Sequence, residues 1–149
     1  GFDAVISMDG DGQHSCDDLA VFMRKAESSN CGVIVGNRMA ITKQMPWLRV
    51  VTNRFMSRLI SKITGQYIPD TQCGFRLVKK DLLRKINLST FKYETESEIL
   101  IQAARLGFKI ESVPVRTIYS GQKSRINPIV DTLRFLRFII LESTRSKHA

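Results

Sequence analysis

Two aspartates and a glutamine stand at alternate positions directly after the first apolar segment of the chain. Residues 2–8 (FDAVISM) lead into residues 9–14 (DGDGQH). Alternate side chains of an extended segment point to one side, so Asp9, Asp11 and Gln13 present three oxygen ligands together. Such ligands suit Mg²⁺ or Mn²⁺, with substrate phosphates filling the remaining positions. We therefore expect a divalent metal site at Asp9, Asp11 and Gln13, with a surface turn rich in Asp and Gly as the structural alternative.

The helix predicted over residues 47–63 carries a second group of candidate ligands. Arg49 and Asn53 are neighbours on one edge of this helix, so a cation and an amide can converge on one ligand. The alternative for Arg49 is an edge residue that snorkels to solvent. Arg54, Arg58 and Lys62 point elsewhere, toward solvent or an acidic membrane. At about 100° per residue, the apolar arc of the helix comprises Leu48, Val51, Phe55, Met56, Leu59 and Ile63.

Two further segments place charged groups at a helix start and in a loop. Glu94 and Glu98 lie one helical turn apart, where they act as general bases or, in the interpretation we favour, as partners of the positive helix end. Residues 121–125 (GQKSR) combine two cations and a hydroxyl in a flexible loop that can close over a pyrophosphate. The loop lacks the spacing of a P-loop. His14 is a metal ligand, a donor to phosphate or a structural histidine.

The net charge of +9 is unevenly distributed along the chain. Residues 1–27 hold six acids and two bases, whereas residues 28–69 hold six bases and no acid. Residues 112–149 hold seven bases and two acids. An acidic cluster beside two basic segments indicates a metal site next to anion sites, and the anion is a phosphate, a nucleic acid or an acidic membrane. A solvated basic surface is the alternative.

Composition limits the possible classes of protein. The chain has 149 residues, 43% of them hydrophobic and 25% charged, which is typical of one soluble globular domain. Its longest apolar run, residues 138–141, is far shorter than the roughly 20 residues of a membrane span. We expect no secretory signal, because Asp3 interrupts the first apolar stretch. Three cysteines without a C-x-x-C pair predict reduced thiols in the cytoplasm rather than disulfides or a zinc site.

These residues must be positioned by elements that alternate between strand and helix. Strands are predicted over residues 2–8, 31–35, 75–78 and 108–117, the first two buried and the last an edge strand because of Pro114. Helices are predicted up to residue 28 and over 47–63, 81–86, 94–106 and 128–142, with Gly65 and Gly107 ending two of them. The fold class is therefore α/β, with a mixed, mostly parallel sheet and helices on both faces.

Ligands of open α/β sheets lie at the carboxyl ends of the strands, and here the first strand already ends in the acidic motif. Because nothing precedes this strand that would hold the rest of a nucleotide, we expect the chain to be the C-terminal part of a longer protein. We divide it into residues 1–127, the catalytic part, and residues 128–149, a basic amphipathic helix and tail. That helix is an interfacial membrane anchor or an ordinary packed terminal helix.

Several motifs in order resemble a known family. They are MDGDGQH after a strand, GNR at 36–38, the MPWLR helix, DTQCGFR at 70–76, YETESEIL at 93–100 and the segment from VPVRT to NPIVDTLRFLR at 113–137. Together they resemble the family-two inverting glycosyltransferases of the GT-A fold, nearest the polyprenyl-phosphate, dolichyl-phosphate-mannose-synthase-like branch. DTQCGFR and SGQKSRINP are the specific parts of this match, which covers nearly the whole chain.

The resemblance implies roles for individual residues. A divalent metal on Asp9 and Asp11 would bridge to the diphosphate of a nucleotide-sugar donor. Arg38, Arg49 and Asn53 would face the phosphate of the acceptor. The sugar pocket would be shaped by Asp70, Gly74 and Phe75. Lys123 and Ser124 would belong to a lid, and Lys123 would stabilise the charge of the leaving diphosphate.

The resemblance also implies partners and location. The acceptor would be a polyprenyl phosphate, so the enzyme would work peripherally at the cytoplasmic face of a membrane and would not bind nucleic acid. Because the Q-x-x-R-W signature of processive synthases is absent, single-sugar transfer is expected. The half of the domain that binds the base would be missing, so these 149 residues alone should have little or no activity.

Two alternatives stay open at the level of the sequence. An apolar strand before D-x-D-G also begins haloacid-dehalogenase-like phosphatases, in which Asp9 would be the nucleophile, although Gln13 stands where those enzymes have Thr. A phosphoaspartate at Asp9 would favour that class. The other alternative is a non-catalytic basic module that binds anionic lipid or nucleic acid, which a steep salt dependence without a metal requirement would favour.

Overall fold

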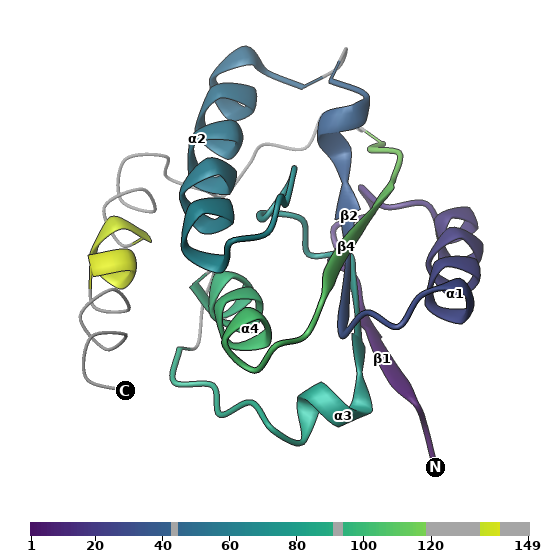
Figure 1. The fold of residues 1–149 in the computed structure, drawn as a ribbon. Coiled ribbons are helices and arrows are strands. Elements are labelled where there is room, and N and C mark those ends of the chain that lie inside the picture. Colours follow the sequence, from purple (N-terminus) through teal and green to yellow (C-terminus); the bar gives the residue numbers. More distant parts are fainter. Residues whose placement is uncertain (43–44, 91–93, 119–134, 141–149) are drawn as a thin grey trace.

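The computed structural model describes residues 1–42, 45–90, 94–118 and 135–140. Strands and helices alternate along this part of the chain, as predicted (Figure 1). In chain order they are β1 (Ala4–Ser7), the 3₁₀ turn η1 (Cys16–Asp18), α1 (Leu19–Ser28), β2 (Val33–Asn37), the 3₁₀ turn η2 (Arg38–Ala40), α2 (Trp47–Thr64), β3 (Arg76–Lys79), α3 (Lys80–Leu83), α4 (Glu94–Arg105) and β4 (Ile110–Pro114). Residues 135–140 are also helical.

Local signals in the sequence determine where the helices begin and end. Ser15 Oγ accepts the N–H of Asp17 at 3.3 Å and so caps η1, which continues into α1. Gly65 follows α2 with φ +67°, and Gly107 follows α4 with φ +77°. This left-handed conformation favours glycine, which confirms the two predicted helix ends.

The sheet is mixed, as predicted, and its described strands have the order β1-β3-β2-β4. Only β2 and β4 pair in parallel, because β3 runs antiparallel to both β1 and β2. The expectation of a mostly parallel sheet is therefore corrected. The loop between α2 and β3 carries the chain to the carboxyl ends of β1 and β2, so that Arg76 lies opposite both Ser7 and Val35.

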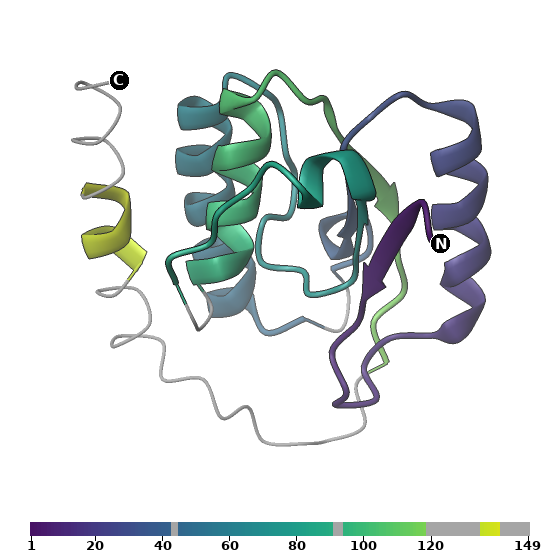
Figure 2. The same ribbon diagram turned by 90° about the horizontal axis from the view of Figure 1, so that it is seen from below.

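Helices cover both faces of this sheet. In Figures 1 and 2, α1 lies on one face, and α2 and α4 lie together on the other. The core lies in the two layers between, and Phe22 of α1 stacks on Phe75 beside β3 with ring centroids 4.4 Å apart. This arrangement agrees with the GT-A-like α/β fold that the resemblance implies.

Strand β1 differs from the buried strand predicted over residues 2–8. It is an edge of the described sheet, and its residues alternate between half-buried and exposed, with Val5 44% exposed. The strand β2 lies between two neighbours and is buried over Val33–Gly36, as predicted. Apolar runs of this length look alike in sequence, and the position in the sheet decides which of them is covered on both faces.

Helix α2 packs through a face that coincides only in part with its apolar arc. The buried residues of the helix are Asn53, Met56, Ser57 and Ile60. Ser57 Oγ accepts the N–H of Thr71 at 3.0 Å and contacts Thr71 Oγ1 at 3.2 Å, so this face binds the loop before β3. The predicted arc is therefore only partly the packing face: Met56 is buried and Leu59 packs against the core, whereas Leu48, Val51, Phe55 and Ile63 stay exposed.

The C-terminal segment is described only over residues 135–140. In both ribbon views this helical segment lies beside α2 (Figures 1 and 2). Phe135 and Phe138 are buried and belong to the same core cluster as Met56 and Ile60. The burial of these two side chains is typical of a packed terminal helix. The rest of residues 128–149 lies outside the described residues. Within the described ranges, no helix has the length and apolarity needed to cross a bilayer.

Candidate functional site

The predicted metal ligands follow β1 at the edge of the sheet where β3 begins. Asp11 Oδ1 accepts the N–H of Gln13 at 3.0 Å, and Gly12 has φ +73° between them. Asp9 and Asp11 are both exposed residues, and Gln13 is half-buried. The turn therefore leaves carboxylate oxygens directed to solvent at the carboxyl ends of the strands, where α/β folds bind ligands.

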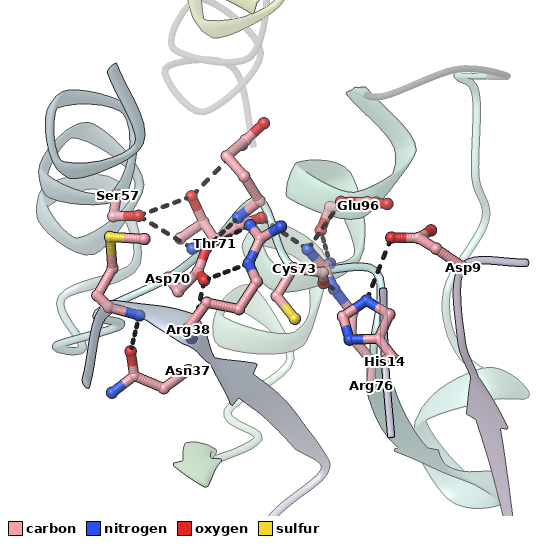
Figure 3. A network of polar contacts seen from close by, with 12 residues as sticks. Asp9, His14, Asn37, Arg38, Ser57, Asp70, Thr71, Cys73, Arg76 and Glu96 are labelled. Atoms are coloured by element: carbon pink, nitrogen blue, oxygen red, sulfur yellow. Dashed lines mark hydrogen bonds and ion pairs between the residues drawn. The ribbon is translucent and has the colours of Figure 1, made fainter. Parts of the chain in front are cut away.

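The carboxylate of Asp9 lies between His14 and Gly74. His14 Nε2 is 3.5 Å from Asp9 Oδ2, as Figure 3 shows, and a Cβ placed on Gly74 would lie 2.2 Å from Asp9 Oδ1. The contact with His14 is the main cause that lowers the pKa of Asp9. Partial burial acts in the opposite direction, and the positive charges of Arg38 and Arg76 lower the pKa further. Asp9 is therefore kept ionised and has a defined position.

His14 is a buried residue of this site rather than an exposed ligand. Its side chain is 3% exposed and its ring meets the edge of Phe75 with centroids 5.2 Å apart. Its backbone pairs with Thr117 in an isolated bridge, and the N–H of Ile118 donates to Gln13 O at 2.9 Å. These contacts join the loop after β1 to the segment that follows β4. Among the described residues, His14 Nδ1 has no hydrogen-bond partner.

Arg38 and Asp70 form a buried ion pair beside this loop. Arg38 Nε donates to Asp70 Oδ2 at 2.8 Å, Nη2 donates to Oδ1 at 3.0 Å, and the backbone N–H of Arg38 donates to Oδ2 at 3.1 Å (Figure 3). Arg38 is 8% exposed and Asp70 is 1% exposed. Burial by itself would lower the pKa of Arg38, but the hydrogen bonds and charge of Asp70 outweigh it and raise that pKa.

The structure thus brings together two residues that the resemblance assigns to different substrates, Arg38 to the acceptor phosphate and Asp70 to the sugar pocket. Within the described ranges no group accepts a hydrogen bond from Arg38 Nη1. Asp70 Oδ1 additionally accepts the N–H of Gln72 at 3.2 Å. Asp70 therefore shapes the site by holding Arg38 and its own loop.

The other predicted site residues lie on α2 or outside the described chain. Asn53 is buried and Arg49 is half-buried, one turn apart on the same helix. No hydrogen bond or ion pair joins either of them to the Arg38–Asp70 pair. Gly74 and Phe75 border Asp9 and His14, as the contacts above show. Lys123 and Ser124 lie outside the described residues.

Arg76 and Glu96 border the candidate site, and our sequence interpretation missed both. Arg76 is 2% exposed, and its guanidinium donates to Cys73 O at 2.7 Å, to Thr71 O at 2.6 Å and to Glu96 O. Its Nη2 also donates to Glu96 Oε2 at 3.2 Å (Figure 3). Arg76 therefore ties the loop before β3 to the start of α4. Arg76 ends the DTQCGFR motif, which is the one signal in the sequence that pointed to this residue.

Glu98, by contrast, binds the segment before α4 rather than the helix end that we favoured as its partner. Its carboxylate accepts the N–H groups of Ser89 and Thr90, both at 2.9 Å, and the Thr90 hydroxyl at 2.7 Å. Burial opposes ionisation of Glu98, but these hydrogen bonds outweigh it and lower its pKa. Glu98 consequently anchors the segment before α4 and has no open position for a substrate.

The chemistry of Asp9, Asp11 and Gln13 fits a hard divalent cation. All three side chains offer oxygen, and the two carboxylates are exposed at the end of a strand. The described residues contain no group of three or more His, Cys, Asp or Glu placed to hold a metal by themselves. Mg²⁺ sites with one or two protein carboxylates and substrate phosphates have this composition. The three cysteines are free thiols, as predicted, and burial raises the pKa of Cys73 to about 12.

Comparison with known proteins identifies the relatives of this chain. A scan against models of protein families finds no match. The UDP-N-acetylglucosamine–dolichyl-phosphate N-acetylglucosaminyltransferase of Methanococcus voltae is 34% identical, over 95% of this chain and 59% of its own. The chain is homologous to dolichyl- and polyprenyl-phosphate glycosyltransferases. A dolichyl-phosphate beta-glucosyltransferase of Trichomonas vaginalis is 29% identical over 85% of this chain and 42% of its own.

A third relative extends the same relationship to bacteria. The polyprenol monophosphomannose synthase of Mycolicibacterium smegmatis is 25% identical, over 77% of this chain and 45% of its own. The chain therefore spans between 42% and 59% of the lengths of these three glycosyltransferases. These relatives favour a glycosyltransferase over the phosphatase that the D-x-D-G motif alone left open.

Replacing Gly74 with alanine is expected to weaken Mn²⁺ binding about 10–100-fold, as loss of a group that orients a metal ligand does. The added Cβ would collide with the Asp9 carboxylate, which is the far end of a half-exposed side chain and can turn toward solvent. The carboxylate would therefore move, and the free energy of unfolding would change by less than about 1 kcal/mol. Calorimetric titration with Mn²⁺ measures the first quantity and urea unfolding the second. Unchanged Mn²⁺ affinity would contradict the close approach of Gly74 to Asp9.

Proposed function

We propose that the protein transfers a single sugar from a nucleotide-sugar donor to a polyprenyl phosphate, with inversion at the anomeric carbon and with a divalent metal as cofactor. The observation that carries this proposal is the homology to glycosyltransferases of dolichyl and polyprenyl phosphate over 95% of the chain in the best-covered case. The site supports it, because carboxylates and buried guanidinium groups meet at the carboxyl ends of β1 and β2.

The donor side of the proposed site is built on the loop after β1. Asp9, Asp11 and Gln13 would hold Mg²⁺ or Mn²⁺, which supplies positive charge for the donor diphosphate when it is bound. His14 and Gly74 fix the direction of the Asp9 carboxylate. Asp70, Gly74 and Phe75 would border the sugar. Lys123 and Ser124, outside the described residues, would complete the donor side as a lid over the diphosphate.

The acceptor side of the proposed site consists of Arg38, Arg49 and Asn53. A phosphate monoester has a second pKa of about 6, so it is ionised at neutral pH and attacks without a dedicated base. The protein then has to orient the phosphate and the anomeric carbon in line, which accounts for inversion in one displacement. Arg38 is already oriented by three hydrogen bonds to Asp70, so little side-chain entropy is lost when a phosphate binds to it.

We further propose that the protein works at the cytoplasmic face of a membrane, where its lipid acceptor lies. Phe135 and Phe138 are buried, so the terminal helix offers less apolar surface for this purpose than its sequence indicates. Helix α2 exposes Trp47 and Phe55, together with the basic side chains of Arg54 and Arg58. Apolar and basic groups on one helix are typical of interfacial binding to anionic lipid.

The test of this function is transfer of labelled sugar from a nucleotide sugar to polyprenyl phosphate by the full-length protein. The wild type is compared with a variant in which Arg49 is replaced by alanine. Loss of one charged hydrogen bond to phosphate is worth about 1.5–3 kcal/mol, so kcat/KM for the lipid phosphate should fall about 10–100-fold. The kinetics for the nucleotide sugar at saturating lipid should change little, because other residues hold that side.

The matched control is Arg24→Ala, which removes an exposed cation from α1, outside the proposed site and the proposed membrane surface. We expect it to alter kcat/KM about twofold or less. A loss that falls on the donor in Arg49→Ala, or equal use of a non-phosphorylated lipid by the wild type, would contradict the acceptor assignment. Absence of transfer with any nucleotide sugar would contradict the proposed function as a whole.

A further inference from the structure

Glu96 is a carboxylate beside the site whose chemistry the proposed reaction does not yet use. It lies in the first turn of α4, and its side chain is 28% exposed, whereas the guanidinium of Arg76 beneath it is 2% exposed. Burial is the main cause that raises the pKa of Glu96, with the charge of Arg76 acting against it and that of Asp9 acting with it. Figure 3 shows the side chains of Asp9 and Glu96 at neighbouring positions, on either side of Arg76 and His14.

Arg76 holds Glu96 by both its backbone and its side chain. The guanidinium donates to the carbonyl oxygen of Glu96 and, at 3.2 Å, to Oε2. Two other donors of the same guanidinium are bound to the loop before β3. The carboxylate is therefore oriented by a buried group that itself has no freedom to move. Among the described residues, no donor bonds to Glu96 Oε1.

Glu96 differs in this respect from the other glutamates of α4. The carboxylate of Glu98 accepts hydrogen bonds from Ser89 and Thr90, and Glu94 is half-buried with no hydrogen bond to the described residues. An oriented carboxylate with an open oxygen accepts hydrogen bonds from neutral hydroxyl groups and repels phosphates. In a nucleotide sugar the group that carries such hydroxyls next to the diphosphate is the transferred sugar.

We propose that Glu96 is a specificity-determining residue whose carboxylate, oriented by Arg76, accepts a hydrogen bond from one hydroxyl of the transferred sugar. This inference rests on the proposed function, because it needs a nucleotide sugar beside Asp9. A polar group built to bind a hydroxyl discriminates strongly against an analogue that lacks it, since the protein group is then left without its partner. Glu96 would thus select the sugar, while Asp9 and Asp11 serve the diphosphate common to all donors.

The test is a cycle of Glu96→Gln against deoxygenated donors in the full-length protein. The donors are nucleotide sugars of N-acetylglucosamine, glucose and mannose, the sugars named for the three relatives, and the best donor is then used with one hydroxyl at a time removed. In Glu96→Gln, the amide oxygen would take the bond from Arg76 and the NH₂ group would face the sugar. We expect kcat/KM for the intact donor to fall about 10–100-fold.

The diagnostic result is loss of additivity at one hydroxyl only. For the wild type, removal of that hydroxyl from the donor should lower kcat/KM by about the same factor as the Glu96→Gln substitution does. For Glu96→Gln, removal of the same hydroxyl should cause almost no additional fall in kcat/KM. A merely structural role of Glu96 would lower the rate for all donors alike, so the two losses would add at every hydroxyl and overturn the inference. Glu94→Gln, which removes the same charge from the same turn, should change kcat/KM about twofold or less.

Two further outcomes distinguish this inference from its rivals. If Glu96→Gln weakens binding of Mn²⁺ alone as strongly as it lowers kcat/KM, Glu96 binds the cation and the inference is wrong. If the wild type transfers none of the sugars, the proposed function fails and the inference fails with it. Transfer by the wild type together with additive losses refutes the role of Glu96 and leaves the proposed function intact.

Discussion

Replacing Asp70 with asparagine is expected to lower the free energy of unfolding by about 3–5 kcal/mol, the usual cost of breaking a buried ion pair. Arg38 donates three hydrogen bonds to Asp70, and both residues are buried. Asparagine keeps the size of the side chain but removes its charge and one acceptor. The guanidinium of Arg38 would stay buried without its counter-charge. Unfolding in urea, followed by circular dichroism, measures the difference.

The control for this variant is Asp17→Asn, the same chemical change at a surface ion pair. Asp17 Oδ2 is 3.6 Å from Arg116 Nη2, and both side chains are more than half exposed. Solvent screens such pairs, so we expect a change below about 1 kcal/mol. A loss of stability in Asp70→Asn no greater than that of the control would show that the Arg38–Asp70 pair does not stabilise the fold.

Replacing Asp9 with asparagine is expected to abolish metal-dependent binding of a nucleoside diphosphate, a loss of about 100-fold or more. Changes to groups that merely orient metal ligands cost 10–100-fold, so loss of a charged ligand should cost at least as much. Asp11→Asn should have the same effect. The side chain of Asp9 is 48% exposed, so we expect the fold to tolerate this substitution. Calorimetric titration of UDP into the full-length protein, with and without Mn²⁺, gives the affinity.

Asp17→Asn again provides the matched control, because it removes an exposed acid from the same acidic segment without touching the predicted ligands. Its Mn²⁺-dependent affinity for UDP should equal that of the wild type. Mn²⁺-dependent affinity that is unchanged in both Asp9→Asn and Asp11→Asn would refute the metal site. Equal losses in all three variants would mean that the general negative charge of this segment, rather than these ligands, attracts the cation.

The sites chosen for these experiments differ in how far the sequence alone identifies them. Asp9, Asp11 and Gln13 are predicted from a local pattern. In an extended segment, alternate residues point to the same side, so their spacing alone indicates that their side chains lie together. The Arg38–Asp70 pair joins residues 32 positions apart, and the Arg76–Glu96 pair joins residues 20 apart. No local period connects such partners, so their contact depends on how the chain folds back.

The local pattern also did not predict fully which face of helix α2 packs against the rest of the protein. Periodicity along α2 indicates an apolar arc that includes Phe55 and Met56, yet the helix exposes Phe55 and buries Asn53 and Ser57 beside Met56. The loop before β3 supplies polar partners for this face, and a buried hydrogen bond between Ser57 and Thr71 is satisfied there. Contacts with neighbouring segments decide which face of such a helix is buried, and the sequence of the helix alone gives no information about those contacts.

By itself the sequence determined the alternation of strands and helices, the helix ends at Gly65 and Gly107, and the acidic turn after β1, all of which depend on residues close together in the chain. The tertiary structure decided the antiparallel course of β3 and its position between β1 and β2. It also decided which charges meet. The physical reason is the same in each case: hydrogen bonds and burial between distant segments outweigh the weak preferences of any one segment.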